Sequence, residues 1–477
     1  MFERTATQHL NTWLKKKRRK PLILRGARQV GKSTLIRMFA QSSGLQLHEI
    51  NLERNLYLND IFKKLDTELI LRELEALSDK IHTANSILFL DEIQATPYAL
   101  QALRYLYEDH PELAVVAAGS LLEFTLSDHN FSMPVGRIEY YHLHPFSFKE
   151  YLGAISPRLL AEQNNLSIHT PLLTTVHNQL LKKLREYFFV GGLPEAVLAF
   201  SEDNSISDVV DVHRSISATY QDDFAKYAKK NDLLLLQKVF NAIPGCLSRK
   251  IKYSNISPED KSNRVKTAIT LLTNARICHR VHHSHGSGLP LAAERAENTY
   301  KLIFMDIGLA NHVCGIDWRA INQKNNIQLV NEGGMAEQFI GQQLLDISKG
   351  LDPPALYYWL REKKSANAEV DYIIEHGQNI FPVEVKAGKS GSLKSIQQFA
   401  FIKKAPVAIR FDLNPLGVQN ICHTIRTRTG NKKVSFTLIS LPLYAVSELD
   451  SILNEYLTSL TPIMGRRLET EKAINPI

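Results

Sequence analysis

Four residues close to the N-terminus have types and a spacing that suit phosphate binding. The pattern GxxxxGK[ST] is matched by Gly26, Gly31, Lys32 and Ser33 in the stretch PLILRGARQVGKSTLIRMFA. Glycines let the backbone turn so tightly that its N–H groups converge on a phosphate at the start of a helix. In this pattern the lysine neutralises the β- and γ-phosphates, and the hydroxyl binds Mg²⁺. We therefore expect ATP and Mg²⁺ to be bound by Gly26, Ala27, Arg28, Gln29, Val30, Gly31, Lys32, Ser33 and Thr34.

An acidic pair follows the next apolar run and suits hydrolysis. In SILFLDEIQ the run from Ile87 to Leu90 reads as a buried parallel strand, and Asp91 and Glu92 come directly after it. Ligands bind at the carboxyl ends of such strands. We expect Asp91 to hold the Mg²⁺ and Glu92 to polarise the water that attacks the γ-phosphate. The pair predicts hydrolysis of ATP and not binding alone.

Arg137 lies in a polar loop just before an alternating strand, Ile138 to Leu143. As a catalytic arginine it would reach its own nucleotide, or that of a neighbouring copy in a homo-oligomer. As a structural residue it would be a surface arginine in a turn. A single charge in a loop is compatible with both interpretations.

A second group of charged residues lies in VDYIIEHGQNIFPVEVKAG. Asp371 ends one apolar alternation, and Glu384 and Lys386 interrupt another. Side chains alternate along a strand, so Glu384 and Lys386 point to the same side, and Asp371 joins them if the two strands pair. Two carboxylates bind Mg²⁺ or Mn²⁺, and a lysine stabilises charge that develops on a phosphate. A metal-dependent nuclease site and a solvated hairpin both have this pattern.

The chain as a whole limits what these groups can belong to. With 477 residues it should form two to four domains, and its formal net charge of +8 mildly favours a polyanion such as DNA. The four cysteines form no CxxC pair, and the N-terminal stretch NTWLKKKRRKPLIL is basic where a signal peptide is apolar. No apolar run reaches about 18 residues, so we expect no membrane span and a cytoplasmic location.

The middle of the chain predicts helices and then a winged-helix arrangement. Residues 151–232 read as helical, and between Leu233 and Val281 two helices are followed by a hairpin. The second helix has a basic start, which would either meet DNA phosphates or only pack within the fold. Its expected buried face is Val265, Ala268, Ile269 and Leu272, and its basic start is Lys261, Arg264 and Lys266.

The hairpin carries a run of metal-ligand residue types. Their spacing fits no standard zinc pattern, and strand alternation scatters them over both faces. We therefore expect a wing with exposed histidines and no metal at Cys278, His279, His282, His283 and His285.

On these motifs the first 150 residues or so resemble the AAA+ class of P-loop ATPases. Through RGARQVGKSTL, LFLDEIQ and GR…L.PFSFKEYL the chain is similar to a bacterial and archaeal family in which such an ATPase is fused to a C-terminal domain of long-unassigned function. The stretch YFFVGGLPEAV matches the same family and reads as a hinge or docking turn. The resemblance implies a five-stranded parallel sheet and a γ-phosphate sensor at Ser120, although AAA+ proteins usually have Asn or Thr there.

The C-terminal charged group resembles the D…ExK arrangement of the restriction-endonuclease-like fold. The similarity extends from about Gly334 to Phe411, and the fused family has the arrangement in the same place. It implies that Asp371, Glu384 and Lys386 are catalytic and that Glu337, on the first helix, joins the two carboxylates as a ligand of Mg²⁺ or Mn²⁺. The fold can equally persist as a binding module that does not cleave.

Together these observations predict an α/β protein with a P-loop parallel sheet, a helical and winged-helix middle, and a restriction-endonuclease-like C-terminal domain. We expect an ATPase that acts on DNA, with a nuclease-like domain. The alternatives are a nucleotide-gated switch for a protein partner and a DNA-binding ATPase whose nuclease-like domain is non-catalytic. The expected units are 1–150 (ATPase), 151–232 (helical linker), 233–300 (winged helix), 301–450 (nuclease-like) and 451–477 (tail).

Overall fold

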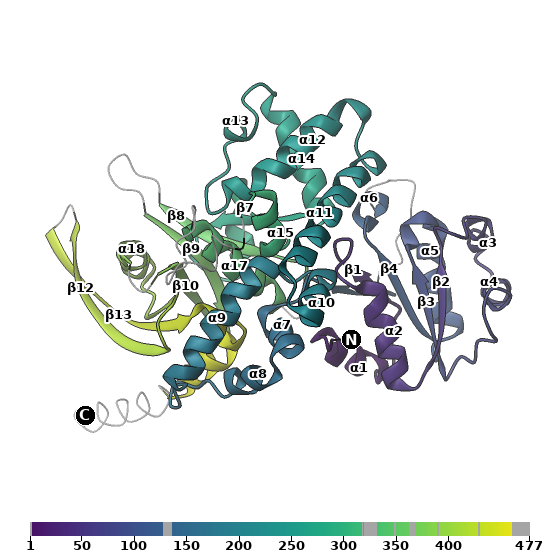
Figure 1. The fold of residues 1–477 in the computed structure, drawn as a ribbon, viewed down its shortest axis with the longest axis horizontal. Coiled ribbons are helices and arrows are strands. Elements are labelled where there is room, and N and C mark those ends of the chain that lie inside the picture. Colours follow the sequence, from purple (N-terminus) through teal and green to yellow (C-terminus); the bar gives the residue numbers. More distant parts are fainter. Residues whose placement is uncertain are drawn as a thin grey trace, which may run out of the picture.

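Two sheets connected by a helical middle form the molecule (Figure 1). The computed structural model describes residues 2–126, 136–316, 318, 332–347, 350–361, 368–388, 391–427 and 430–459. The smaller sheet lies on the right of Figure 1 and the larger one on the left, beyond the helices of the middle. The expected α/β class is confirmed, with its parallel N-terminal sheet, helical middle and C-terminal sheet domain.

The N-terminal sheet has five strands in the order β2-β3-β4-β1-β5, and all of its pairings are parallel. Helices cover both faces, so a central strand is apolar on both sides: Leu22 and Leu24 face one core cluster and Ile23 the other. The five-stranded parallel sheet is confirmed. Its elements are α1 (Ala6–Leu14), β1 (Leu22–Arg25), α2 (Lys32–Ser43), β2 (Gln46–Asn51), α3 (Leu58–Phe62), α4 (Thr67–Glu75), β3 (Ser86–Asp91), η1 (Ile93–Ala95), α5 (Pro97–Asp109), β4 (Ala114–Gly119), α6 (Leu122–Leu126) and β5 (Glu139–His142).

The middle of the chain is helical, as expected. α14 buries the predicted face, Val265, Ala268, Ile269 and Leu272. The elements are α7 (Phe148–Ile155), α8 (Pro157–Asn164), α9 (Thr174–Val190), α10 (Pro194–Asp203), α11 (Ile206–Asp223), η2 (Phe224–Lys226), η3 (Lys230–Asp232), α12 (Leu233–Ala242), η4 (Ile243–Cys246), α13 (Tyr253–Ile256) and α14 (Ser262–Asn274).

The C-terminal sheet has eight strands in the order β12-β13-β11-β10-β9-β8-β6-β7. Its elements are β6 (Cys278–Ser284), η5 (Leu291–Glu294), β7 (Arg295–Phe304), α15 (Ile307–Val313), α17 (Glu332–Ile347), β8 (Leu356–Arg361), β9 (Ala368–His376), β10 (Asn379–Val385), α18 (Lys394–Lys403), β11 (Val407–Asp412), β12 (Gly417–Thr427), β13 (Gly430–Pro442) and η6 (Leu443–Glu448). Residues 449–459 are helical, and the rest of the expected tail, 460–477, lies outside the described residues.

The hairpin β6–β7 belongs to this large sheet, because β6 pairs in parallel with β8. The expected boundary at residue 300 therefore falls inside β7, since the same hairpin follows α14 and forms the edge of the C-terminal sheet. The expected exposure of the histidines is wrong for His279 and His283, which are buried where β6 packs between its neighbours. His285 is exposed.

Arg264, one of the three basic residues at the start of α14, is neutralised within the fold. Arg264 pairs with Asp232 at 2.8 Å and with Asp260 at 3.0 Å. Lys266 donates to the Asn298 side chain at 3.0 Å. This helix start therefore offers less positive charge to DNA than its sequence suggests.

None of the helices in the described ranges is long and apolar enough to cross a membrane.

Candidate active site

The loop between β1 and α2 has the conformation that the glycine pattern requires. Gly31 caps α2 with φ +90°, a left-handed value that side chains with a Cβ rarely adopt. A Cβ on Gly26 would lie 2.4 Å from the Leu143 carbonyl oxygen, so this glycine allows the loop to pass close to the chain after β5. The glycines therefore hold the loop against the sheet with its N–H groups at the start of α2.

Lys32 points back over this loop. Its ammonium donates to the carbonyls of Gly26 at 3.0 Å and Ala27 at 2.8 Å. Burial lowers its pKa to about 8, against the opposing influence of Glu92 and Asp91. A buried cation beside backbone carbonyls and carboxylates is well suited to bind phosphate oxygens.

The two motifs that the sequence predicts for Mg²⁺ meet directly. The Ser33 hydroxyl donates to Asp91 Oδ2 at 2.7 Å. Burial raises the pKa of Asp91, and the Ser33 hydrogen bond partly opposes that shift. A hydroxyl and a carboxylate at one point are the hard oxygen donors that Mg²⁺ prefers, so this pair fits the ion. Beside it, Glu92 has a left-handed φ of +53°, and its carboxylate accepts from the Gln94 amide.

These residues line one open cavity of about 400 Å³. Of the predicted nucleotide ligands, Gly26, Ala27 and Val30 do not line the cavity. The carbonyls of Gly26 and Ala27 accept from Lys32, and that of Val30 accepts from Arg4. The residues that line the cavity are Arg28, Gln29, Gly31, Lys32, Ser33, Thr34, Arg37, Asp91, Glu92, Ser120 and Thr219.

One wall of the cavity comes from α11, which the sequence analysis did not connect with the nucleotide. Thr219 lines the cavity, and Asp223, one turn further, pairs with Arg28 at 2.7 Å. Arg28 also donates to the Ser120 hydroxyl at 3.3 Å. No local signal links α11 to a loop almost 200 positions earlier, so only the folded chain identifies this wall. Through Arg28 the sensor position Ser120 is connected to the helical middle.

Arg137 lies away from this cavity. Its guanidinium pairs with Glu108 at 2.9 Å, and its side chain is 46% exposed. It is absent from the residues that line the nucleotide cavity within the described chain. The structure therefore does not bring Arg137 to the nucleotide site of its own chain.

The stretch YFFVGGLPEAV docks against the phosphate loop. A Cβ on Gly31 would lie 3.3 Å from Pro194 Cγ, at the start of α10. The Phe146 N–H donates to the Gly192 carbonyl at 2.6 Å. The Gly192 N–H donates to the buried carboxylate of Asp306 at 2.6 Å. The expected docking turn thus links the nucleotide loop to the segment that follows β7.

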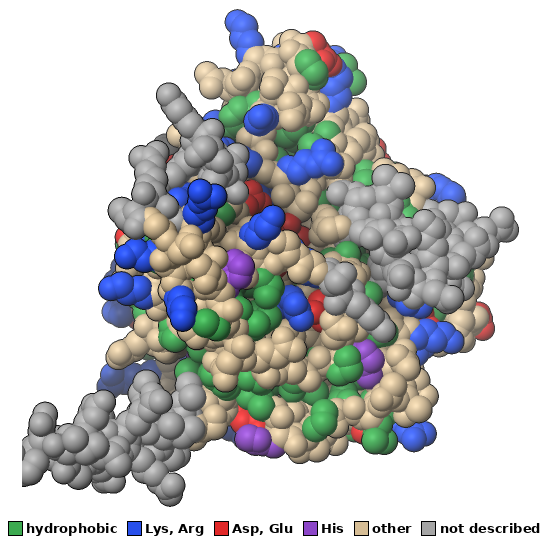
Figure 2. Space-filling view, turned by 90° about the vertical axis from the view of Figure 1, so that its left-hand side faces the viewer, with side chains coloured by type: hydrophobic (Ala, Val, Ile, Leu, Met, Phe, Trp, Pro, Cys, Tyr) green, Lys and Arg blue, Asp and Glu red, His purple; other side chains and the backbone are tan. Residues whose placement is uncertain are grey.

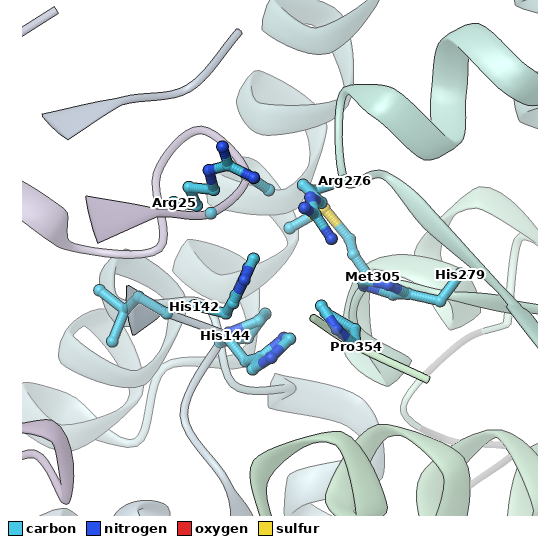
Figure 3. A pocket seen from close by; sticks show the side chains of 11 residues that line it. Arg25, His142, His144, Arg276, His279, Met305 and Pro354 are labelled. Carbon is cyan, nitrogen blue, oxygen red and sulfur yellow. The ribbon is translucent and has the colours of Figure 1, made fainter. Parts of the chain in front are cut away.

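A small cavity of about 10 Å³ lies on the other side of the phosphate loop (Figure 3). Figure 3 shows His142 and His144, from the end of the N-terminal sheet, facing Arg276, His279 and Pro354. Burial, with Arg276 nearby, lowers the pKa of both His142 and His144 to about 3. These rings are therefore neutral at physiological pH and join the ATPase sheet to the C-terminal part.

The predicted nuclease-like residues also come together. Asp371 on β9 accepts the Val385 N–H at 2.7 Å, and Lys386 pairs with Glu384 at 2.5 Å. Burial, and then Asp371, raise the pKa of Glu384 to about 7. The other oxygen of Glu384 is buried without a hydrogen-bond partner among the described atoms. The pairing of β9 with β10 is what places these residues side by side.

Glu337 is bound by a lysine that the sequence analysis missed. Lys301, on β7 and 1% exposed, pairs with Glu337 at 2.7 Å and with Glu369 at 2.5 Å. Burial lowers the pKa of Lys301, but the carboxylates of Glu337, Asp371 and Glu369 more than offset this, so its pKa is raised. Among the described residues, no three His, Cys, Asp or Glu side chains are grouped as metal ligands. Glu337 thus takes part in an internal ion pair with Lys301.

Three family models match separate parts of the chain. One described as an AAA domain matches residues 18–152, and two domains of unknown function, DUF8612 and DUF4143, match residues 181–320 and 332–444. No curated protein matches the chain.

Solved structures of low similarity include the Thermotoga maritima RuvB Holliday junction branch migration motor, at 15% identity and a TM-score of 0.26, covering 59% of this chain and 90% of RuvB. Another is a STAND protein with a tetratricopeptide repeat sensor from Pyrococcus horikoshii, at 12% identity and a TM-score of 0.25, covering 74% of this chain and 46% of that one. With the AAA match and the geometry of Lys32, Ser33 and Asp91, residues 18–152 form an AAA-type P-loop ATPase domain.

Proposed function

We propose that the protein is a Mg²⁺-dependent ATPase that acts on DNA, in which the nucleotide cycle rearranges a nuclease-like C-terminal domain. The observation that carries the ATPase part is the hydrogen bond from Ser33 to Asp91, which unites the two nucleotide motifs at the mouth of one cavity. Mg²⁺ held by these two groups would neutralise charge on the phosphates.

Each remaining residue has a separate task in this mechanism. Lys32 exchanges its two backbone carbonyls for β- and γ-phosphate oxygens. Glu92 leaves Gln94 and accepts a proton from the attacking water. Arg28 and Ser120 contact the γ-phosphate. The release of this phosphate is transmitted to α11 through the ion pair of Arg28 with Asp223. Arg137, held by Glu108 away from its own nucleotide, acts on the nucleotide of a neighbouring copy in a homo-oligomer.

The DNA-directed part of the proposal depends on the C-terminal cluster. Asp371, Glu384 and Lys386 lie on paired strands, and one Glu384 oxygen is buried without a partner among the described atoms. An unpartnered buried carboxylate oxygen is unfavourable unless a cation or a proton reaches it. Asp371 and Glu384 would hold Mg²⁺ or Mn²⁺, and Lys386 would stabilise charge on the scissile phosphate.

A second candidate is a DNA-binding ATPase, or a nucleotide-gated protein switch, whose C-terminal cluster does not cleave. The pairing of Lys301 with Glu337 favours it, because an internal ammonium already neutralises one of the expected metal ligands. Of the three expected metal ligands, only Asp371 and Glu384 then remain without an internal ammonium from Lys301.

A cleavage assay separates these candidates. Purified protein is incubated with plasmid and single-stranded DNA, with Mg²⁺ or Mn²⁺, and with or without ATP. Asp371→Ala and Lys386→Ala should abolish cleavage, Lys32→Ala reports whether ATP gates it, and Lys394→Ala, an exposed lysine on α18, is the matched control. Cleavage that survives Asp371→Ala rules out this nuclease site. DNA-stimulated ATP hydrolysis without cleavage favours the non-catalytic candidate.

A further inference from the structure

A groove of about 630 Å³ lies where the middle of the chain meets the C-terminal sheet. It is lined by Lys250, in the segment after η4, and by residues of β6 and β7. Trp359 and Arg361 of β8 and Phe401 and Lys403 of α18 line it as well. Segments more than 100 positions apart therefore build a single surface. Neither the ATPase site nor the Asp371 cluster uses the residues that line it.

The groove is positively charged. Lys250, Arg361 and Lys403 line it, and no Asp or Glu within the described ranges does. Arg361 donates to the Gln398 amide oxygen, and Lys403 donates to the Ser287 hydroxyl at 2.9 Å. Both partners are neutral, so these hydrogen bonds orient the cations without cancelling their charge. Arg264 differs from these two cations, because its charge is neutralised by two aspartates. A polyanion is the ligand that such a surface fits.

Apolar and aromatic side chains lie among these cations. Phe401 is half-buried, and Ile402 is 40% exposed. Trp359, which lines the groove, is packed edge-on against Phe399. Figure 2 views the molecule from the side of α18 and the β12–β13 hairpin, where Lys and Arg side chains are interspersed with exposed hydrophobic ones. Base faces stack on aromatic side chains while the backbone phosphates meet cations.

The groove adjoins the nuclease-like cluster through paired strands. Leu360 pairs with Glu369 and Arg361 pairs with Ala368 between β8 and β9. Glu369 is one of the two carboxylates that Lys301 binds. The groove is therefore one strand pair away from this cluster, with Arg361 directed to Gln398 of α18 and Glu369 directed to Lys301.

We propose that this groove binds single-stranded nucleic acid. Arg361 and Lys403 contact its phosphates, and Phe401 stacks on a base. A duplex hides its base faces and would leave Phe401 and Ile402 against water, so the unpaired strand fits better. The inference rests on the proposed action on DNA and adds where the strand lies and in which form it is bound.

Fluorescence anisotropy of the full-length protein tests this assignment. The probes are a labelled single strand longer than about 16 nucleotides and a duplex of the same length, titrated over a series of salt concentrations. Arg361→Ala and Lys403→Ala should each lower the slope of log K against log salt by about 0.7 for the single strand. Phe401→Leu keeps the apolar contact but removes the aromatic face, and it should weaken single-strand binding about fivefold or more. Lys394→Ala should change neither quantity.

The outcomes separate the groove from the function as a whole. Single-strand binding that keeps its affinity and slope in Arg361→Ala and Lys403→Ala overturns the groove and leaves the proposed action on DNA intact. Tighter binding of the duplex, with Phe401→Leu without effect, overturns the single-strand assignment. If the protein hydrolyses ATP but binds neither probe at low salt, both the groove and the action on DNA are wrong. Retained ATP hydrolysis in weakly binding variants supports the groove.

Discussion

The hydroxyl of Ser33 and the carboxylate of Asp91 lie 2.7 Å apart, although 58 positions separate them in the chain. The loop after β1 and the end of β3 meet because β4 pairs in parallel with both strands. Parallel strands bring their carboxyl ends to one edge, where loops bind ligands. The nucleotide site is thus a consequence of strand order, and the following changes test its parts and their coupling to the rest.

Glu92→Gln should retain ATP binding and lower kcat for ATP hydrolysis by about 10²–10⁴-fold, because an amide cannot accept the proton of the attacking water. Isothermal titration with ATP and Mg²⁺ measures binding, and phosphate release measures turnover. Glu259→Gln, in the exposed pair with Lys238 away from the nucleotide cavity, is the control. Unchanged turnover in Glu92→Gln would remove Glu92 from the mechanism.

Gly192→Ala should destabilise the protein by about 1–3 kcal/mol or more, because the added Cβ would lie 2.1 Å from the Phe146 carbonyl oxygen. Since Pro194 packs on Gly31, the same variant should also weaken ATP binding. The matched control is Gly245→Ala, where a Cβ meets nothing within 4 Å. Urea unfolding and ATP titration of both variants measure the effects. Equal stability of the two would contradict the close approach at Gly192.

Lys301→Met should destabilise the protein by about 3–5 kcal/mol, because it leaves Glu337 buried without its cation. Adding Glu337→Gln to Lys301→Met should recover part of this loss, since the uncompensated charge is then gone. Urea midpoints of the two single variants and the double variant form a double-mutant cycle. Strictly additive effects would show that the two side chains do not interact in solution.

Stability should fall as the pH drops below about 6.5. His142 and His144 have folded-state pKa values of about 3, whereas unfolded histidine titrates near 6.5, so the unfolded chain binds more protons between these values. Each ring contributes stability that is fully present above about 6.5 and is lost at about 1.4 kcal/mol per pH unit below it. The free energy of unfolding, measured with urea at pH values from about 7.5 to about 5, should depend less steeply on pH for His144→Gln than for the wild type. Exposed His169→Gln should leave the slope unchanged.

The sequence alone determined the local chemistry. The glycine pattern before Lys32, the apolar run before Asp91 and the alternation around Glu384 are short-range features, and each predicts an element with a polar residue at a defined place. The buried face of α14 also follows from spacing within one helix. Such patterns work because hydrophobic periodicity and turn geometry are properties of neighbouring residues.

Only the tertiary structure decided how distant segments share charges and surfaces. Lys301 and Glu337 lie on different elements, so no local pattern predicts that the ammonium of Lys301 pairs with Glu337, an expected metal ligand. Arg264 looks like a DNA contact in sequence but is paired with two aspartates in the fold. The same holds for the wall that α11 gives to the nucleotide cavity and for the groove between β8 and α18. Whether a charge is neutralised or exposed depends on what lies within a few ångströms, and folding alone sets those neighbours.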